Sequence, residues 1–254
     1  MNARSDPFDA WIEALEARHL VDLTFSEVRK ALQALSSLYV ERRPRIPTGA
    51  ALDGAGKRAA FALYYGPLHF LLVREIVRAL GAARTSTGRI VDLGCGTGAA
   101  GAAWALEHDP EGRPPLLGID RNPWAAAEAS WTYRTLGLAG TARTLDLVRA
   151  RLGGGGVLLA FTVNELPLDA RSRLLRRLID VAERGARVLV VESIARPVTP
   201  WWEEWRAAFA SSGGRADEWR FRVEIPPLLR RLDQAAGLDH RELTGRSLWV
   251  ARHY

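Results

Sequence analysis

Hydrophobic residues repeat at helical spacing in the first third of the chain. Two stretches predict amphipathic helices: Phe8, Trp11, Ile12, Leu15 and Leu20, and then Val28, Leu32 and Leu35. A break containing proline and glycine covers residues 42–56, and the helical pattern resumes from Arg58 to Leu80. We therefore predict an N-terminal helical cap over residues 1–85.

The pattern changes after Arg89, where short apolar runs alternate with helical segments. This alternation is typical of parallel strands joined by crossover helices. The predicted strands are Ile90–Leu93, Leu116–Asp120, Ala142–Leu145, Val157–Val163 and Val188–Val191, and the predicted helices are Ala99–His108, Trp124–Leu136 and Ala170–Arg184.

The C-terminal part does not follow the same alternation. A tryptophan-rich insertion at about 195–225 exceeds a minimal α/β unit, and a proline-started helix is predicted over Pro226–Ala236. Arg241–Leu243 and Ser247–Ala251 are predicted to form a terminal hairpin. The expected fold class is α/β. Residues 86–254 would form a doubly wound, Rossmann-like, mostly parallel sheet with an antiparallel terminal strand, preceded by the N-terminal helical region.

Composition narrows the class of protein only modestly. The net charge is +6, and all but two of the 35 basic residues are arginine, which fits either a nucleic-acid partner or genomic codon bias. No apolar run reaches the roughly 18 residues that a membrane span needs. The single cysteine, Cys95, excludes an internal disulfide and a cysteine-based metal cluster. A cytoplasmic protein without a metal site is the simplest expectation.

A glycine-rich turn follows the first predicted strand. The residues are Gly94-Cys95-Gly96-Thr97-Gly98, and they lead directly into a predicted helix. Glycines allow a ligand to approach the backbone closely, and a helix N-terminus offers free N–H groups. With Ala99 the turn also satisfies the looser dinucleotide-binding pattern. Asp92 argues against a dinucleotide, because a carboxylate at the strand end suits a ligand that carries an ammonium group.

The acidic residue, one spacer and then Gly-x-Gly-x-Gly resemble the first motif of class I S-adenosylmethionine (SAM)-dependent methyltransferases. The resemblance implies SAM as cofactor, with S-adenosylhomocysteine (SAH) as product, bound by Asp92 and the turn residues Gly94, Cys95, Gly96 and Gly98. It also implies that Asp120, which ends the second strand, binds the ribose, with Arg121 beside it. Asp146 after the third strand would contact the adenine amino group.

The fourth predicted strand runs into Asn164 and Glu165. Ligands of open α/β sheets lie beyond the carboxyl ends of the strands, so both side chains are candidate catalytic residues. Asn164 could position an acceptor N–H or O–H group, and Glu165 could act as a base or orient the acceptor. The alternative for Asn164 is a helix cap.

Three further segments resemble the methyltransferase-like proteins associated with the small ribosomal subunit. These segments are residues 52–61, residues 64–70, and Asn164-Glu165-Leu166-Pro167 followed by Arg171. The resemblance implies that Tyr64 lies on a helix covering the cofactor and that RNA or the small ribosomal subunit is a partner.

Three functions therefore stay open at this point. The leading hypothesis is a SAM-dependent methyltransferase acting on ribosomal RNA or a small molecule. The alternatives are a non-catalytic SAM-binding assembly factor and an NAD(P)-dependent oxidoreductase, which Asp92 disfavours. No lysine lies downstream of the glycine turn to complete a Tyr-x-x-x-Lys pair for the oxidoreductase.

Overall fold

The computed structural model describes residues 6–41, 52–84, 87–195 and 199–251. They group into two compact units. The first unit comprises residues 1–68 and 222–242, and the second comprises residues 69–221 and 243–254. A C-terminal segment that the sequence pattern assigned to the second domain thus belongs to the first unit.

The first unit is helical. Its elements are α1 (Pro7–His19), α2 (Phe25–Glu41), α3 (Ala55–Ala60), the π-helix η3 (Phe61–Tyr65) and α9 (Pro227–Ala236). The predicted apolar positions within α1 and α2 are buried, which confirms both amphipathic patterns. Leu20, predicted as part of the first pattern, follows the end of α1 and is only partly buried. Thr24 and Glu27 form a capping box at the start of α2: the Thr24 N–H donates to Glu27 Oε2 (2.8 Å) and the Glu27 N–H to Thr24 Oγ1 (3.3 Å).

The second unit contains a seven-stranded sheet in the order β3-β2-β1-β4-β5-β7-β6. Strands β1 to β5 are parallel, whereas β7 runs antiparallel to both β5 and β6. The chain order reverses between β1 and β4, which places the topological switch point there. The strands are β1 (Ile90–Leu93), β2 (Leu116–Asp120), β3 (Gly140–Thr144), β4 (Gly156–Ala160), β5 (Arg187–Glu192), β6 (Arg215–Phe221) and β7 (Leu243–Val250).

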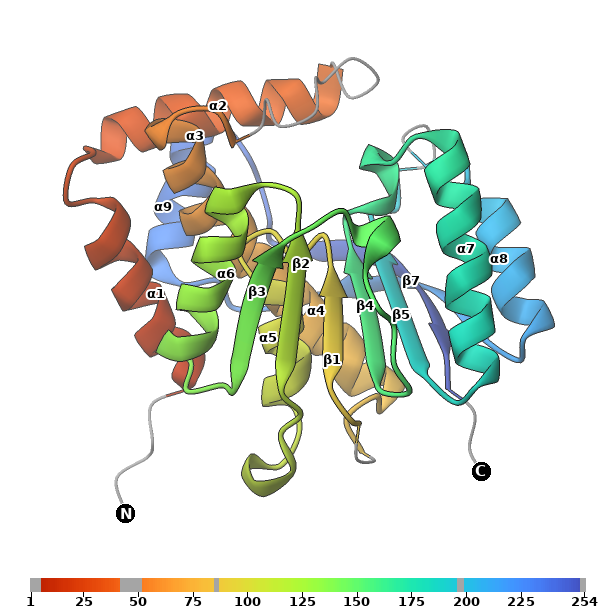
Figure 1. Ribbon diagram of the computed structural model, residues 1–254. Helices are drawn as coiled ribbons and strands as arrows, with labels where there is room; N and C mark the ends of the chain where they lie inside the picture. The colour runs from red at the N-terminus through yellow and green to blue at the C-terminus, as the bar shows by residue number, and fades with distance from the viewer. Residues whose placement is uncertain (1–5, 42–51, 85–86, 196–198, 252–254) are drawn as a thin grey trace. The chain divides into compact units, whose positions relative to one another are not determined.

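Helices cover both faces of this sheet, as Figure 1 shows. Residues 69–80 of α4 and helix α5 lie on one face, and α7 and α8 lie on the other. The helices are α4 (Gly66–Leu80), α5 (Ala99–Leu106), α6 (Pro123–Thr135), α7 (Leu168–Glu183) and α8 (Trp202–Ser211), with short 3₁₀ turns η4 (Pro110–Gly112), η5 (Leu147–Arg149) and η6 (Val163–Glu165). The expected doubly wound α/β fold with an antiparallel strand is confirmed.

Two details of the C-terminal prediction need correction. The tryptophan-rich insertion forms helix α8 and the edge strand β6 of the sheet. Trp202 and Trp205 of α8 pack into the core. The terminal hairpin is wrong, because Leu243–Val250 is one continuous strand that pairs with β5 and β6. Gly245, interpreted as a turn residue, lies within this strand against Leu72 of α4. A Cβ atom there would lie 2.9 Å from Leu72 Cδ2.

None of the described helices combines the length and the apolar character that crossing a membrane requires.

Candidate functional site

The glycine-rich turn connects β1 to α5 with three left-handed residues. Gly94, Gly96 and Gly98 have φ values of 72°, 51° and 78°. At Gly94 a Cβ atom would lie 2.3 Å from Thr162 Cγ2, and at Gly98 it would lie 2.7 Å from Tyr133 Cε1. Both positions therefore require glycine on conformational and on steric grounds.

Asp92 lies below this turn and is buried, with 1% of its surface exposed. Its Oδ2 accepts a hydrogen bond from the Gly101 N–H in the first turn of α5 (3.0 Å). Within the described part of the chain, its Oδ1 is buried and has no hydrogen-bond partner. Burial raises the pKa of Asp92 to about 7, an effect that the Gly101 N–H partly offsets. The site therefore contains a buried acceptor atom that a donor or a cation would satisfy.

Gly101 makes this position of Asp92 sterically accessible. A Cβ atom at residue 101 would lie 2.7 Å from Asp92 Oδ2, which is too close for any side chain. The sequence pattern places Gly101 only within a helix, so its contact with Asp92 was not predicted.

Asp120 holds the turn to the end of β2. Its Oδ2 accepts from the Gly96 N–H (3.0 Å), and its Oδ1 accepts from the Asn122 N–H (2.8 Å). The residue that caps α6 is Asn122, whose side chain accepts from the N–H groups of Trp124 and Ala125. Asp120 thus lies beside the glycine turn, and each of its oxygens keeps a lone pair for a ligand hydroxyl.

Two other predicted cofactor residues have local structural partners. The Cys95 side chain is buried, and its Sγ would lie 2.8 Å from a Cβ atom at Gly118, so the thiol packs beneath the turn. Burial raises the pKa of this thiol well above its usual range. Asp146 is exposed, and its Oδ1 accepts from the Val148 N–H (2.9 Å) at the start of η5.

The segment after β4 is anchored by a buried carboxylate that the sequence analysis missed. Glu192, at the end of β5, is fully buried and accepts from the Val163 N–H (3.1 Å) and from Asn164 Nδ2 (3.0 Å). Asn164 Oδ1 in turn accepts from the Trp201 indole N–H (2.7 Å). The polar end of an otherwise apolar strand, the same signal as at Asp92 and Asp120, could have identified Glu192.

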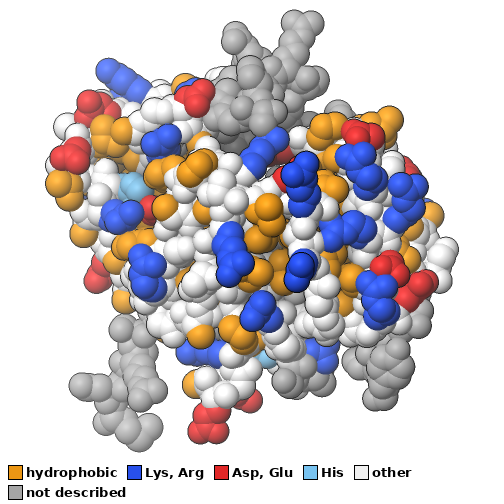
Figure 2. Space-filling model, viewed as in Figure 1, with side chains coloured by type: hydrophobic (Ala, Val, Ile, Leu, Met, Phe, Trp, Pro, Cys, Tyr) orange, Lys and Arg blue, Asp and Glu red, His pale blue; other side chains and the backbone are white. Residues whose placement is uncertain are grey.

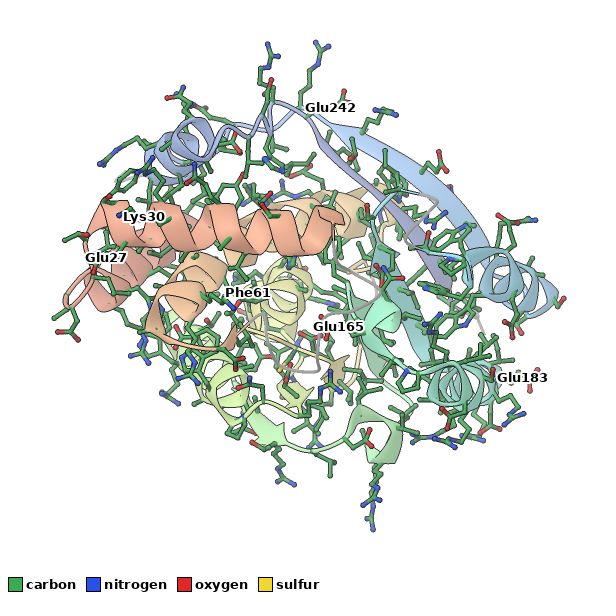
Figure 3. All side chains as sticks on the ribbon, turned by 90° about the horizontal axis from the view of Figure 1, so that it is seen from above. Glu27, Lys30, Phe61, Glu165, Glu183 and Glu242 are labelled. Carbon is green, nitrogen blue, oxygen red and sulfur yellow. The ribbon has the colours of Figure 1, made fainter. Side chains whose placement is uncertain are left out.

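Glu165 differs from Asn164 because its side chain is exposed. It projects from the segment after β4 (Figure 3), and its Oε2 lies 3.8 Å from Arg121 Nη2. Arg121 follows β2, and β1 lies between β2 and β4 in the sheet. The pair therefore connects the two strand ends that flank the glycine turn.

Tyr64 belongs to the first unit and is fully buried there. Its hydroxyl donates to Asp233 Oδ1 of α9 and lies 2.7 Å from His240 Nδ1. Burial, followed by the bond to Asp233, raises the pKa of Tyr64 far above its usual range. The structure accounts for Tyr64 through these bonds, and its contact with a cofactor stays a prediction.

Comparison with solved structures identifies the fold. The similarity to an O-methyltransferase family protein from Burkholderia thailandensis covers 94% of this chain and 76% of that protein's chain, with a TM-score of 0.58 and 15% sequence identity. The similarity to mitomycin 7-O-methyltransferase covers 98% of this chain and 73% of that enzyme's chain, with a TM-score of 0.51 and 17% sequence identity. The similarity to a candidate O-methyltransferase from Nostoc punctiforme covers 89% of this chain and 69% of that protein's chain, with a TM-score of 0.55 and 12% sequence identity.

These likenesses show that the chain has the Rossmann-like fold of those proteins. No family model and no curated protein matches the sequence. Among the residues that the structure describes, no group of three or more His, Cys, Asp or Glu side chains is placed to hold a metal ion.

Proposed function

We propose that this protein is a SAM-dependent methyltransferase. The observation that carries the proposal is the buried Asp92 carboxyl group beneath the glycine turn, with Oδ1 lacking a partner in the described part of the chain. An ammonium group would satisfy this oxygen and favour its ionised form. In a dinucleotide site the same turn would hold a pyrophosphate. The negative charge of the pyrophosphate would repel a carboxylate that is buried away from water.

The other residues of the turn fit the same cofactor. Asp120 can accept hydrogen bonds from a ribose diol while it keeps its bonds to Gly96 and Asn122. Asp146, at the end of the neighbouring strand, is the candidate for the adenine amino group, and Arg121 and Cys95 complete the predicted set. When bound, SAM would supply an electrophilic methyl group, so this chain has mainly to bind and orient the reactants.

Residues after β4 would face the acceptor. Because both ends of the Asn164 amide are bonded, we assign it the task of positioning this segment through Glu192 and Trp201. Glu165 is the exposed carboxylate of the segment and would orient the acceptor or take its proton.

An RNA acceptor is supported by the distribution of charge. Lys and Arg side chains are spread over the face seen in Figure 2. The second unit exposes six arginines on α6, on β3, on α7 and around η5: Arg134, Arg143, Arg149, Arg151, Arg173 and Arg176. Such side chains bind phosphates without reading sequence. The same charge fits a SAM-binding assembly factor that methylates nothing, and turnover in the presence of RNA separates the two functions.

Calorimetric titration with SAM, SAH and NADH tests the proposal. We expect micromolar binding of SAM and SAH and none of NADH. Asp92→Asn should weaken SAM binding about tenfold or more, because it removes the charge from a buried charge-assisted hydrogen bond. Asp169→Asn, a matched change on the exposed surface of α7, should leave the affinity unchanged. Binding of NADH alone would reject the methyltransferase assignment.

A further inference from the structure

One residue beside the site has a strained backbone. Among the described residues, Phe161 is the only one other than glycine with a positive φ, at 57°. A bulky residue reaches this conformation only when its surroundings impose it, and such strain clusters at functional sites. Its N–H still donates to the Val191 carbonyl (2.9 Å), so the strand end remains attached to β5.

The strained conformation accompanies a close aromatic contact. The Phe161 ring stacks on the imidazole of His69, with ring centroids 4.1 Å apart and planes inclined by 17°. His69 comes from the first turns of α4, whose Leu72 packs on the sheet at Gly245. Both residues are only partly buried, so part of the pair's surface is accessible.

The location of the pair in the sheet indicates what this surface binds. Phe161 follows the last residue of β4 and precedes Thr162, whose Oγ1 lies 3.3 Å from the Gly94 carbonyl oxygen. The pair therefore lies at the switch point between β1 and β4, where open α/β sheets bind their ligands. Flat aromatic surfaces bind planar rings by stacking and tolerate variation in the rest of the ligand.

We propose that the Phe161–His69 pair is the platform that recognises the methyl acceptor, and that the acceptor presents a planar aromatic ring. This inference rests on the proposed methyltransferase function. The ring belongs either to a free aromatic compound or to a base of single-stranded RNA, since both offer the same stacking chemistry.

The test uses the full chain loaded with SAH and two aromatic probes. The free probe is 6,7-dihydroxycoumarin, with cyclohexane-1,2-diol as its non-aromatic control. The RNA probe is a single-stranded pentanucleotide, compared with the same strand lacking its central base. The variants are Phe161→Leu, which removes the ring, and Phe161→Tyr, which keeps it. Phe221→Leu disrupts the Trp219–Phe221 stack elsewhere in the second unit and serves as the matched control.

We expect one aromatic probe to bind the wild-type SAH complex, and its non-aromatic or abasic counterpart to bind more weakly. Phe161→Leu should lower that affinity about tenfold, in the range found when a stacking side chain is truncated, whereas Phe161→Tyr and Phe221→Leu should retain it. The probe that binds identifies the source of the ring.

The platform is rejected if SAH binds but neither aromatic probe does, or if Phe161→Leu binds the probe as well as wild type. The affinity of Phe161→Leu for SAH must equal that of wild type, so that a loss of probe binding is not caused by a loss of SAH. A protein that fails to bind SAH at all would instead contradict the proposed function.

Discussion

The amide of Asn164 donates to the buried carboxylate of Glu192 at a distance of 3.0 Å. This bond joins the segment after β4 to the end of β5, and the Val163 N–H donates to the same carboxylate. Asn164 therefore connects two neighbouring strand ends at the edge where ligands bind. We therefore expect Asn164 mainly to fix the position of the segment after β4.

Asn164→Ala should accordingly lower the stability of the protein. The change leaves Glu192 Oε2 without its Asn164 donor and Trp201 Nε1 without its acceptor in a buried environment. Each such loss costs about 1–3 kcal/mol. Urea unfolding followed by tryptophan fluorescence measures the change in the free energy of unfolding.

Glu165→Ala is the matched control for this effect. Glu165 is exposed and its ion pair with Arg121 is long, so its removal should change stability by no more than about 0.5 kcal/mol. Equal stability of the two variants, with turnover lost only in Asn164→Ala, would show that Asn164 acts in catalysis directly.

Cofactor binding should depend on pH through Asp92. An ammonium group requires the carboxylate form, and burial raises the pKa of Asp92 to about 7. Below that pH the affinity for SAH should fall by up to about tenfold per pH unit, and above it the affinity should level off. Titrations between about pH 5.5 and 8.5 measure this slope, and the same titrations of Asp92→Asn report the contribution of other groups. Asp92→Asn should bind weakly across the whole range, and a wild-type affinity that stays constant would contradict the role of Asp92.

Stability should show the opposite trend. The folded protein binds the Asp92 proton more tightly than the unfolded chain, whose carboxyl group has a pKa near 3.8. The stabilisation from this group is complete below about pH 4 and is lost as the pH rises through about 7. The loss is at most about 4 kcal/mol. Asp92→Asn cannot ionise, so its free energy of unfolding relative to wild type should rise between pH 4 and pH 8. A constant difference in chemical denaturation would rule this out.

Gly101→Ala should destabilise the site through Asp92. The new Cβ atom would lie 2.7 Å from Asp92 Oδ2 and would displace the carboxylate or the first turn of α5. We expect a cost of about 1–3 kcal/mol, as for other overpacked positions. Gly153→Ala, where the new atom meets nothing within 4 Å, should be nearly neutral. In a double-mutant cycle with Asp92→Ala, the cost of Gly101→Ala should shrink, whereas additive effects would place the strain elsewhere.

The alternation of apolar runs predicted most of the second unit. The limits of β1 and β2 agree with the predicted strands, and the glycine turn lies between β1 and α5 as expected. These features depend on neighbouring residues, where periodicity and backbone conformation are informative. Gly245 misled the prediction because its small size serves contact with Leu72, which is distant in sequence.

The missed parts of the site depend on contacts between distant residues. Glu192 bonds to Asn164 across 28 positions. The first unit shows the same dependence on distant residues, since Tyr64 bonds to Asp233 across 169 positions. No local pattern encodes which polar side chains meet after folding. A polar residue at the end of an apolar strand indicates an edge position, but its partner emerges only from the packing of the sheet.

Tyr64→Phe tests how far the resemblance to known proteins extends in the first unit. The change removes the hydroxyl that donates to Asp233 and leaves His240 as that carboxylate's partner, through Nδ1 (2.6 Å) and the backbone N–H (2.9 Å). Loss of a buried bond to a charged acceptor should lower the free energy of unfolding by about 1.5–3 kcal/mol. SAH affinity at a temperature where the variant is folded should equal that of wild type, because every bond named here lies within the first unit. A variant of unchanged stability whose SAH affinity drops would instead establish Tyr64 as a cofactor-binding residue, as the resemblance implies.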